Sequence, residues 1–317
     1  MSTKTKKCPV CGSLEVVKRG IQDGVQIYWC KEDNHRFRNK KRDHHEYVWN
    51  EYVFHKQTVR ELKKETGHDK KTILGYLKRF EVKKKTDHIP RNINLVVDAT
   101  YFGKRRTGQS WGVILFRDPK MKENLWWKYV THESAADYFE GKEYLEKLGY
   151  TIKSVTADGF LGLPRVFKDI PFQMCHFHMK QIVIRAVTLR PQTEAGQVIL
   201  ALIQTLTYTT EEVFKERIRE FHVRYVDFLN EKTIHPDGSS SYTHEGVRTA
   251  YTSLIRWFPY LFTFKTNQYI PNTTNTCDGH FSHIKDILRI HRGVSKLFKQ
   301  KMIDAILLES TIAPKDK

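Results

Sequence analysis

Two short apolar segments, each leading into an aspartate, constrain the fold of this chain more than any other feature. Residues 93–99 (INLVVDA) are typical of a buried strand with Asp98 near its end, and residues 152–156 predict a second strand that leads into Asp158. Two further strands, at 111–116 and 125–130, and a helix at 134–148 lie between them. A connection that contains a helix places the strand at 152–156 parallel to its partner.

The order of these elements predicts the class of fold. A short helix at 163–168 and a strand at 172–175 complete a β-β-β-α-β-α-β order, which matches an α/β domain with a ribonuclease-H-like mixed sheet. In that sheet the first and fourth strands are neighbours, so Asp98 and Asp158 lie side by side where open α/β sheets bind ligands. Two close carboxylates repel each other unless they share a proton or a cation, and their oxygens suit magnesium or manganese.

A third aspartate stands at the start of an expected amphipathic helix. Residues 272–293 (NTTNTCDGHFSHIKDILRIHRG) place Asp278 in the first turn, and the apolar residues that follow recur at the spacing of one helical face. The helix dipole also favours an acid here, so a simple helix-start role is the alternative. With Asp98 and Asp158, however, Asp278 completes a carboxylate set that predicts two-metal phosphoryl transfer. The basic residues expected to face outward toward phosphates are Lys285, Arg289 and Arg292.

The beginning of the chain carries a motif typical of a zinc ribbon, which predicts a domain over residues 1–42. A Cys-x-x-Cys pair is followed by one more cysteine and a histidine, and Asp33 stands where a fourth cysteine is usual. This spacing predicts one structural zinc ion, with His35 or Asp33 as the last ligand; free thiols are the alternative. An odd total of five cysteines also favours a metal site over disulfides. The candidate ligands are Cys8, Cys11, Cys30 and His35, and a hairpin is expected around Gly20 and Gly24.

Residues 43–82 predict three short helices, the last two forming a helix-turn-helix. Thr58 and Glu61 form a capping box, Gly67 can close that helix, and Asp69 can cap the next one. In this motif the N-terminal side chains of the second helix contact base edges in the major groove. An ordinary helical hairpin with a solvated basic face is the alternative. The residues expected to contact DNA are Lys70, Lys71 and Thr72 at bases, and Lys78 and Arg79 near phosphates.

The net charge is strongly positive and unevenly distributed. Residues 1–90 hold 22 Lys and Arg against 12 Asp and Glu, so they carry +10 of the formal +18. Clustered cations bind phosphates by releasing counterions, which predicts that this part binds double-stranded DNA. The polar segment at 83–91 is expected to be a linker. A polar start and short apolar runs predict an intracellular protein, cytoplasmic and nucleoid-associated, without membrane contact.

Four segments are more specific together than any one of them alone. They are VVDATYFG at 96–103, TADGFLGL at 156–163, CHFHMKQIV at 175–183 and TNTCDGHFSHIKDILRIHRG at 274–293. Together they resemble the acidic-triad transposases of bacterial insertion sequences related to the Mutator superfamily. The resemblance implies that Asp98, Asp158 and Asp278 are the catalytic acids and hold two magnesium or manganese ions. That family usually has Glu as its third acid, and the other acids considered for this role are Asp286 and Glu245.

The resemblance extends to the segment after the second acid. A Cys-x-x-His motif, here Cys175 and His178, is a mark of the family and is expected to be structural or to line the DNA path. Residues 184–270 predict an α-helical insertion that separates two parts of the core, 92–183 and 271–317. Within it, Trp257 can stack on an unpaired base, although aromatic residues at such spacing more often lie in a core.

These features together predict a DNA transposase. Its front end binds terminal inverted repeats, and its carboxylates support strand cleavage and strand transfer with two metal ions. Because an element has two ends, a homodimer or a larger assembly on DNA is expected. Two alternatives remain: a catalytically inactive, transposase-derived DNA-binding regulator, and a structure-specific DNA nuclease that cuts without joining.

Overall fold

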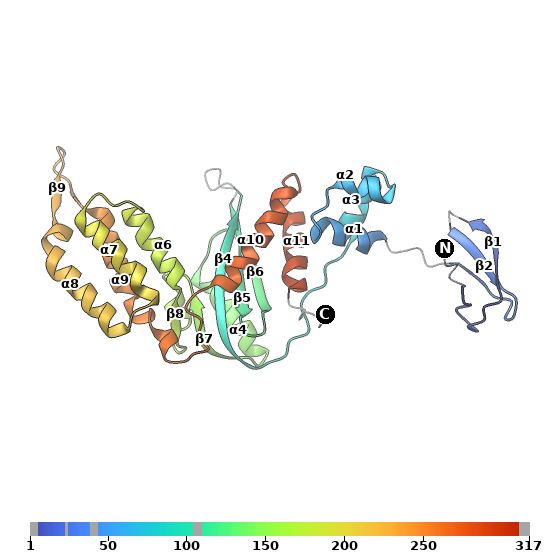
Figure 1. Cartoon of the computed structure of the whole chain (residues 1–317), viewed down its shortest axis with the longest axis horizontal. Helices are drawn as coiled ribbons and strands as arrows, with labels where there is room; N and C mark the ends of the chain where they lie inside the picture. Colours follow the sequence, from blue (N-terminus) through green and yellow to red (C-terminus); the bar gives the residue numbers. More distant parts are fainter. Residues whose placement is uncertain (1–5, 23–24, 39–43, 104–109, 311–317) are drawn as a thin grey trace. The chain divides into compact units, whose positions relative to one another are not determined.

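The computed structural model describes residues 6–22, 25–38, 44–103 and 110–310 (Figure 1). The chain divides into two compact units, one within residues 1–81 and one within residues 82–317. Gly24 and the expected boundary at 42–43 lie outside the described residues. Among the described residues, no helix is long and apolar enough to cross a membrane.

The first unit begins with a small antiparallel sheet. Its strands pair in chain order, β1 (Val16–Gln22), β2 (Val25–Cys30) and β3 (Arg36–Arg38). The expected hairpin is confirmed, and a third strand extends it. Only Cys8, Ile27 and Cys30 are buried among the described residues up to 38, which is too few for an independent hydrophobic core. A fold of this size therefore depends on another source of stability, such as a bound metal.

Three helices follow in the same unit: α1 (His44–Val53), α2 (Val59–Thr66) and α3 (Lys70–Arg79). Both hydrogen bonds of the capping box at Thr58 form, and Gly67 ends α2 in the left-handed conformation with φ of 71°. Asp69 caps α3 by accepting the backbone N–H of Thr72. The ring of Trp49 stacks on Phe80 with centroids 4.7 Å apart. The expected helices and their caps are confirmed.

The second unit is built on a five-stranded mixed sheet. Its strands are β4 (Asn92–Phe102), β5 (Trp111–Asp118), β6 (Glu123–Val130), β7 (Thr151–Ala157) and β8 (Phe172–Met174). They lie in the order β6-β5-β4-β7-β8, with β4 antiparallel to β5 and parallel to β7. The expected adjacency of the first and fourth strands of this sheet is therefore confirmed.

Helices cover both faces of this sheet. Trp126 and Trp127 are consecutive in β6 and point to opposite faces. Trp126 lies against Gly141 of α4 (Ala135–Lys147), whereas Trp127 donates from Nε1 to Asp304 of α11 (Lys296–Glu309) over 2.8 Å. The strand register aligns Asp98 with Trp127 through β5, so Asp98 lies on the α11 side. On that side α10 (Asn275–Ile290) packs against β4.

A helical segment lies between β8 and α10, next to β8 in Figure 1. The short α5 (Leu163–Val166) precedes β8, and the segment itself contains α6 (His176–Val187), α7 (Glu194–Gln204), α8 (Glu211–Asn230) and α9 (Glu245–Trp257). A small hairpin of β9 (Lys232–Ile234) and β10 (Ser240–Tyr242) connects α8 to α9. The strand expected to reach residue 175 ends at Met174, so Cys175 and His178 lie at the start of a helix.

The segment expected to be a linker is partly packed onto the second unit. The ammonium group of Lys85 lies 2.8 Å from a carboxylate oxygen of Glu123, and its side chain is only 6% exposed. Arg91 contacts both Asp118, at 2.7 Å, and Glu123. These acids lie at the two ends of the β5–β6 turn. They bind basic side chains of the segment, whose charge had suggested that it was exposed to solvent. The chain is therefore fixed to the sheet from Lys85 onward.

The contact between α4 and the sheet gives a stability prediction. A Cβ added at Gly141 would lie 2.7 Å from ring atoms of Trp126 and 2.8 Å from the ring of Phe116. We expect Gly141→Ala to lower the free energy of unfolding by about 1–3 kcal/mol, because the overpacked rings cannot move without strain. The control is Gly279→Ala on α10, where no atom lies within 4 Å of the added Cβ. Equal free energies of unfolding in urea for the two variants would contradict this account.

Candidate metal centre and DNA-binding residues

The parallel pairing of β4 and β7 places two aspartates side by side. Val97 pairs with Ala157, so Asp98 in β4 and Asp158, which directly follows β7, lie at the same level. The Asp98 side chain is 3% exposed, and its Oδ1 accepts the N–H of Ala99 over 2.8 Å. Asp158 Oδ1 accepts the N–H of Phe160 over 3.2 Å. Local backbone donors thus hold both carboxylates in place.

Two more residues close over this pair from other elements. One ligand atom each of Asp98, His178 and Asp278 lies within 4.8 Å of the other two. His178 comes from the first turn of α6 and Asp278 from the first turn of α10. Asp158 lies outside this group of three. We refer to Asp98, Asp158, Asp278 and His178 together as the carboxylate site. The shorter side chain of Asp278 reaches Asp98, although the resembling family usually has Glu.

The electrostatics of the carboxylate site favour a bound cation. Burial raises the pKa of Asp98 well above its ordinary value, and the charges of Asp158 and Asp278 raise it further. Burial also raises the pKa of Asp158, with a contribution from Asp278. Burial lowers the pKa of His178, so its imidazole is neutral and has a lone pair to offer. Carboxylate oxygens suit magnesium or manganese, whereas an imidazole nitrogen suits a transition-metal ion better than magnesium, and any divalent ion would neutralise the repulsion.

Two residues near the carboxylate site were not anticipated. Glu133, in the β6–α4 connection, also raises the pKa of Asp98, and its carboxylate accepts the Tyr138 hydroxyl over 2.6 Å. Thr274 immediately precedes α10, and its hydroxyl lies near both Asp278 and His178. The only sequence signal for Thr274 was its position four residues before Asp278. Glu133 lies in a connection between two elements, where no periodic pattern of apolar residues predicts the direction of a side chain.

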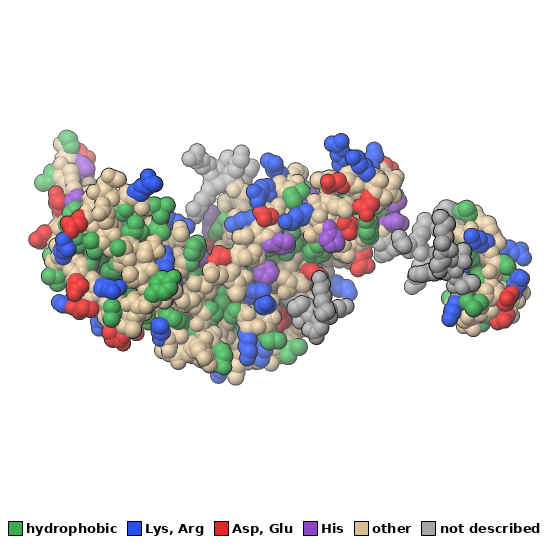
Figure 2. Space-filling view, viewed as in Figure 1, with side chains coloured by type: hydrophobic (Ala, Val, Ile, Leu, Met, Phe, Trp, Pro, Cys, Tyr) green, Lys and Arg blue, Asp and Glu red, His purple; other side chains and the backbone are tan. Residues whose placement is uncertain are grey.

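The three basic residues expected near phosphates lie in or just after α10. Lys285, Arg289 and Arg292 are all exposed, and Figure 2 shows Lys, Arg and His side chains gathered over this helix. Arg289 forms an ion pair with Asp286, one of the other acids considered for the third position. Neither Asp286 nor Glu245 belongs to the group formed by Asp98, His178 and Asp278. The contact of these basic residues with phosphates stays a prediction.

The structure corrects the expectation for Trp257. Its side chain is 3% exposed and belongs to the hydrophobic core. The ring stacks on Phe172 with centroids 6.4 Å apart, and Tyr260 contacts it edge-on. A base cannot stack on a ring whose faces are already covered. The aromatic spacing that suggested a DNA contact thus reflects packing of α9 against β8.

Of the two candidates for the fourth ligand of the cysteine site, the structure brings Asp33 and not His35 to the three thiols. Cys8, Cys11, Cys30 and Asp33 have ligand atoms within 4.8 Å of one another. The Cys8 thiol donates to Asp33 Oδ2 over 3.0 Å, and this contact lowers the pKa of Asp33 to about 2. His35 instead stacks its ring near Phe37. Three thiols and one carboxylate could hold a zinc ion, with Asp33 in the place assigned to His35.

The residues expected to read DNA are presented by α3. Lys70, Lys71, Lys78 and Arg79 are exposed, and Thr72 is half-buried. Arg79 bends back, donating from Nε to the carbonyl of Gly75 and lying over the ring of Tyr76. An exposed basic N-terminal turn is compatible with a recognition helix. The DNA contacts of α3 stay a prediction.

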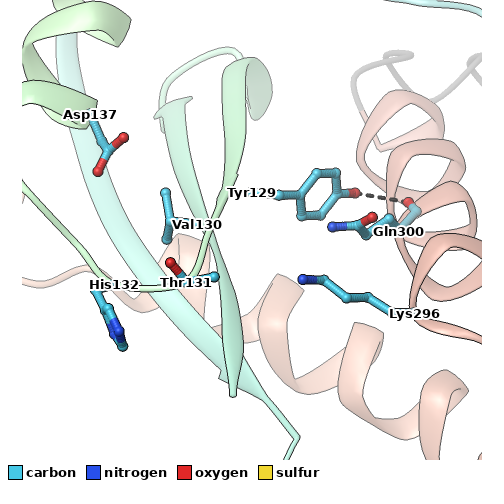
Figure 3. Close-up of a pocket in the computed structure, with 7 residues that line it drawn as sticks. All are labelled: Tyr129, Val130, Thr131, His132, Asp137, Lys296 and Gln300. Carbon is cyan, nitrogen blue, oxygen red and sulfur yellow. Dashed lines mark hydrogen bonds between the residues drawn. The ribbon is translucent and has the colours of Figure 1, made fainter. Parts of the chain in front are cut away.

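A separate cleft of about 410 Å³ lies between the end of β6 and the start of α11 (Figure 3). In it Tyr129 points to α11 and donates its hydroxyl to the carbonyl of Gln300 over 2.8 Å. Asp137 is engaged by Lys128 at 2.7 Å. The remaining lining residues are Val130, Thr131, His132 and Lys296. No residue of the carboxylate site lines this cleft, and we assign the chemistry to the acidic residues rather than to the cleft.

Comparison with solved structures finds distant structural likenesses, among them one to a transposase. The Drosophila P element transposase, in its strand transfer complex, aligns with a TM-score of 0.38 and 10% sequence identity, covering 90% of this chain and 95% of that chain. An alignment at this level does not establish a shared fold. No protein-family model and no curated protein matches the sequence.

The pKa of Asp98 predicts how stability depends on pH. This pKa is raised in the folded state, so folding favours the protonated Asp98 carboxyl. The stability of the folded state is therefore highest below the pKa that Asp98 has in the unfolded chain, and it falls as pH rises through the folded-state pKa. We therefore expect metal-free Asp98→Asn to melt higher than wild type at pH 8, by about 2–4 °C for each kcal/mol of relieved repulsion. The difference should vanish below about pH 4. Scanning calorimetry in EDTA measures it; a lower melting temperature for Asp98→Asn at pH 8 would contradict the prediction.

The fourth zinc ligand can be tested with two matched variants. We expect Asp33→Ala to weaken zinc binding, because it removes a carboxylate that lies against the thiols, whereas His35→Ala should retain it. Chelator competition with a colorimetric zinc indicator gives the affinity and stoichiometry of both proteins. Loss of zinc binding in His35→Ala but not in Asp33→Ala would show that His35 is the fourth ligand.

Proposed function

We propose that this protein is a divalent-metal-dependent DNA transposase and that its sheet is the core of a ribonuclease-H-like domain. The observation that carries the proposal is the carboxylate site: Asp98 and Asp158 level on parallel strands, with Asp278 and His178 closing over them. Close carboxylates that repel each other are unfavourable unless a cation or a proton is shared, and the raised carboxyl pKa values of Asp98 and Asp158 mark a candidate functional site.

Each part of the chain has a role in this proposal. Asp98, Asp158 and Asp278, with His178, would hold magnesium or manganese. Divalent ions in such a site activate the attacking oxygen and stabilise the leaving oxygen in phosphoryl transfer. The local backbone donors to Asp98 and Asp158 fix the direction of their free oxygens. Basic residues on α10 then hold the phosphate backbone of the reacting strand by charge.

The first unit would deliver the DNA. Helix α3 has the cap, length and exposed basic first turn of a recognition helix, and it would read a terminal inverted repeat. The ribbon that precedes it in the chain would add phosphate contacts through its surplus of cations. Two element ends would be joined in a homodimer or a larger assembly on DNA.

A strand-transfer assay tests the activity. The protein is incubated with labelled duplexes from the DNA that flanks its coding sequence, a supercoiled target plasmid and MnCl₂. We expect joined products whose yield falls at least about 100-fold in Asp98→Asn and in Asp278→Asn, since each change removes several kcal/mol of transition-state stabilisation. The matched control is Asp286→Asn, which removes a half-buried acid of the same helix that forms an ion pair with Arg289.

The outcomes separate the three functions that the sequence left open. Joining that depends on Asp98 and Asp278 supports a transposase. Cleavage without joining favours a nuclease, and specific binding without cleavage favours a regulator. Activity that survives Asp278→Asn and disappears in Asp286→Asn would show that the third acid had been assigned to the wrong turn of α10.

A further inference from the structure

One buried threonine connects the Cys-x-x-His motif to the third acid. Thr274 is fully buried at the start of α10. Its hydroxyl oxygen lies 3.3 Å from Asp278 Oδ2 and 3.4 Å from His178 Nδ1. It therefore touches two residues of the carboxylate site.

Cys175 holds the same threonine from the other side. The backbone N–H of Thr274 donates to Cys175 Sγ over 3.3 Å, and the threonine hydroxyl lies 3.5 Å from that sulfur. Cys175 is itself fully buried. Because α6 begins at His176, the side chains of Cys175 and His178, three positions apart, reach the same point. Both ends of the motif thus converge on Thr274, which gives the motif a physical role.

The hydroxyl of Thr274 does not perform the usual task of a threonine at a helix start. Such side chains normally accept a backbone N–H of the first turn. No such bond forms at Thr274, although its carbonyl accepts the N–H groups of Cys277, at 2.8 Å, and Asp278, at 3.2 Å. The hydroxyl is directed at the side chains of the carboxylate site instead.

The chemistry of the three groups decides the direction of the hydrogen bonds. The Thr274 hydroxyl donates its single proton to Asp278 Oδ2, since a carboxylate oxygen accepts. Its oxygen can then accept from His178, which requires the proton of the neutral ring to be on Nδ1. The lone pair of His178 is consequently on Nε2. Metal-binding histidines commonly donate their second ring nitrogen in this way, and the partner fixes the tautomer.

We propose that Thr274, anchored by Cys175, is a positioning residue that orients the Asp278 carboxylate and holds His178 in the tautomer with Nδ1 protonated. This inference rests on the proposed metal-dependent function, because it treats His178 and Asp278 as ligands. It requires no contact between Thr274 and DNA. Removing the hydroxyl therefore affects metal binding before any substrate is present.

The first test measures Mn²⁺ binding to the full chain without DNA, by the electron paramagnetic resonance of free Mn²⁺. Thr274→Val preserves the shape of the side chain and removes the hydroxyl, and we expect it to weaken binding about 10- to 100-fold. Thr274→Ser keeps the hydroxyl and should recover most of the affinity. The control is Thr252→Val on α9, an exposed threonine whose hydroxyl bonds only carbonyls of its own helix.

The second test observes the tautomer directly in the metal-free protein. Long-range ¹H–¹⁵N spectra distinguish Nδ1–H from Nε2–H histidines, and the signal missing in His178→Gln identifies the residue. We expect the Nδ1–H form in wild type and Thr274→Ser, and loss of that preference in Thr274→Val. Should Thr274→Val fail to fold, Thr274→Ala replaces it in both measurements.

The two tests distinguish failure of this inference from failure of the proposed function. Unchanged Mn²⁺ affinity and an unchanged tautomer in Thr274→Val would overturn the role of Thr274, while wild-type binding of Mn²⁺ would leave the proposed function standing. A wild-type protein that binds no Mn²⁺ would overturn the metal site as drawn. In that event an Nε2–H tautomer at His178 would also overturn the role of Thr274, and an Nδ1–H tautomer lost in Thr274→Val would support it.

Discussion

The repulsion between three closely placed carboxylates, one of them buried, is the constraint on which the second unit depends. The register of β4 and β7 fixes Asp98 beside Asp158, and α10 brings a third, half-buried acid to a place against the buried Asp98. A charge in such a place is costly unless it is paired or neutralised. The sheet, α6 and α10 all contribute one or two groups to that place, so the fold is organised around an electrostatic demand that only a proton or a cation satisfies.

The position of α10 follows from hydrogen bonds to the segment just before it. The hydroxyl of Thr156 donates to the carbonyl of Pro271 over 2.6 Å, and the N–H of His176 donates to the carbonyl of Asn272 over 2.9 Å. The helical segment thus begins at α6, and its end, just before α10, is hydrogen-bonded to the first residue of α6. A long insertion whose ends are fixed together adds little conformational cost, because closure entropy rises slowly with length. The bundle can therefore be large without displacing Asp278.

Sequence patterns predicted those features that depend on local chemistry. Apolar runs located the strands around Asp98 and Asp158, and the capping residues Thr58, Gly67 and Asp69 located the ends of α2 and α3. Three-dimensional packing decided the rest. The α9 pattern could not show which neighbour covers Trp257, and a Cys-x-x-Cys spacing could not distinguish Asp33 from His35 as the fourth residue. The last strand ends at Met174, one residue earlier than expected, and α6 begins at His176. His178 therefore lies in the first turn of a helix, where its side chain is grouped with Asp98 and Asp278.

The aspartate in the third position makes precise placement of α10 more important. Asp has one methylene fewer than Glu, so it loses less rotamer freedom when held but also reaches less far. A small displacement of α10 that a glutamate could follow would carry the Asp278 carboxylate out of reach of Asp98. The contacts of Thr274 with Cys175, His178 and Asp278 oppose that displacement, because they join the start of α10 to the start of α6. A short third acid and a tightly held helix start are thus two parts of one geometric solution.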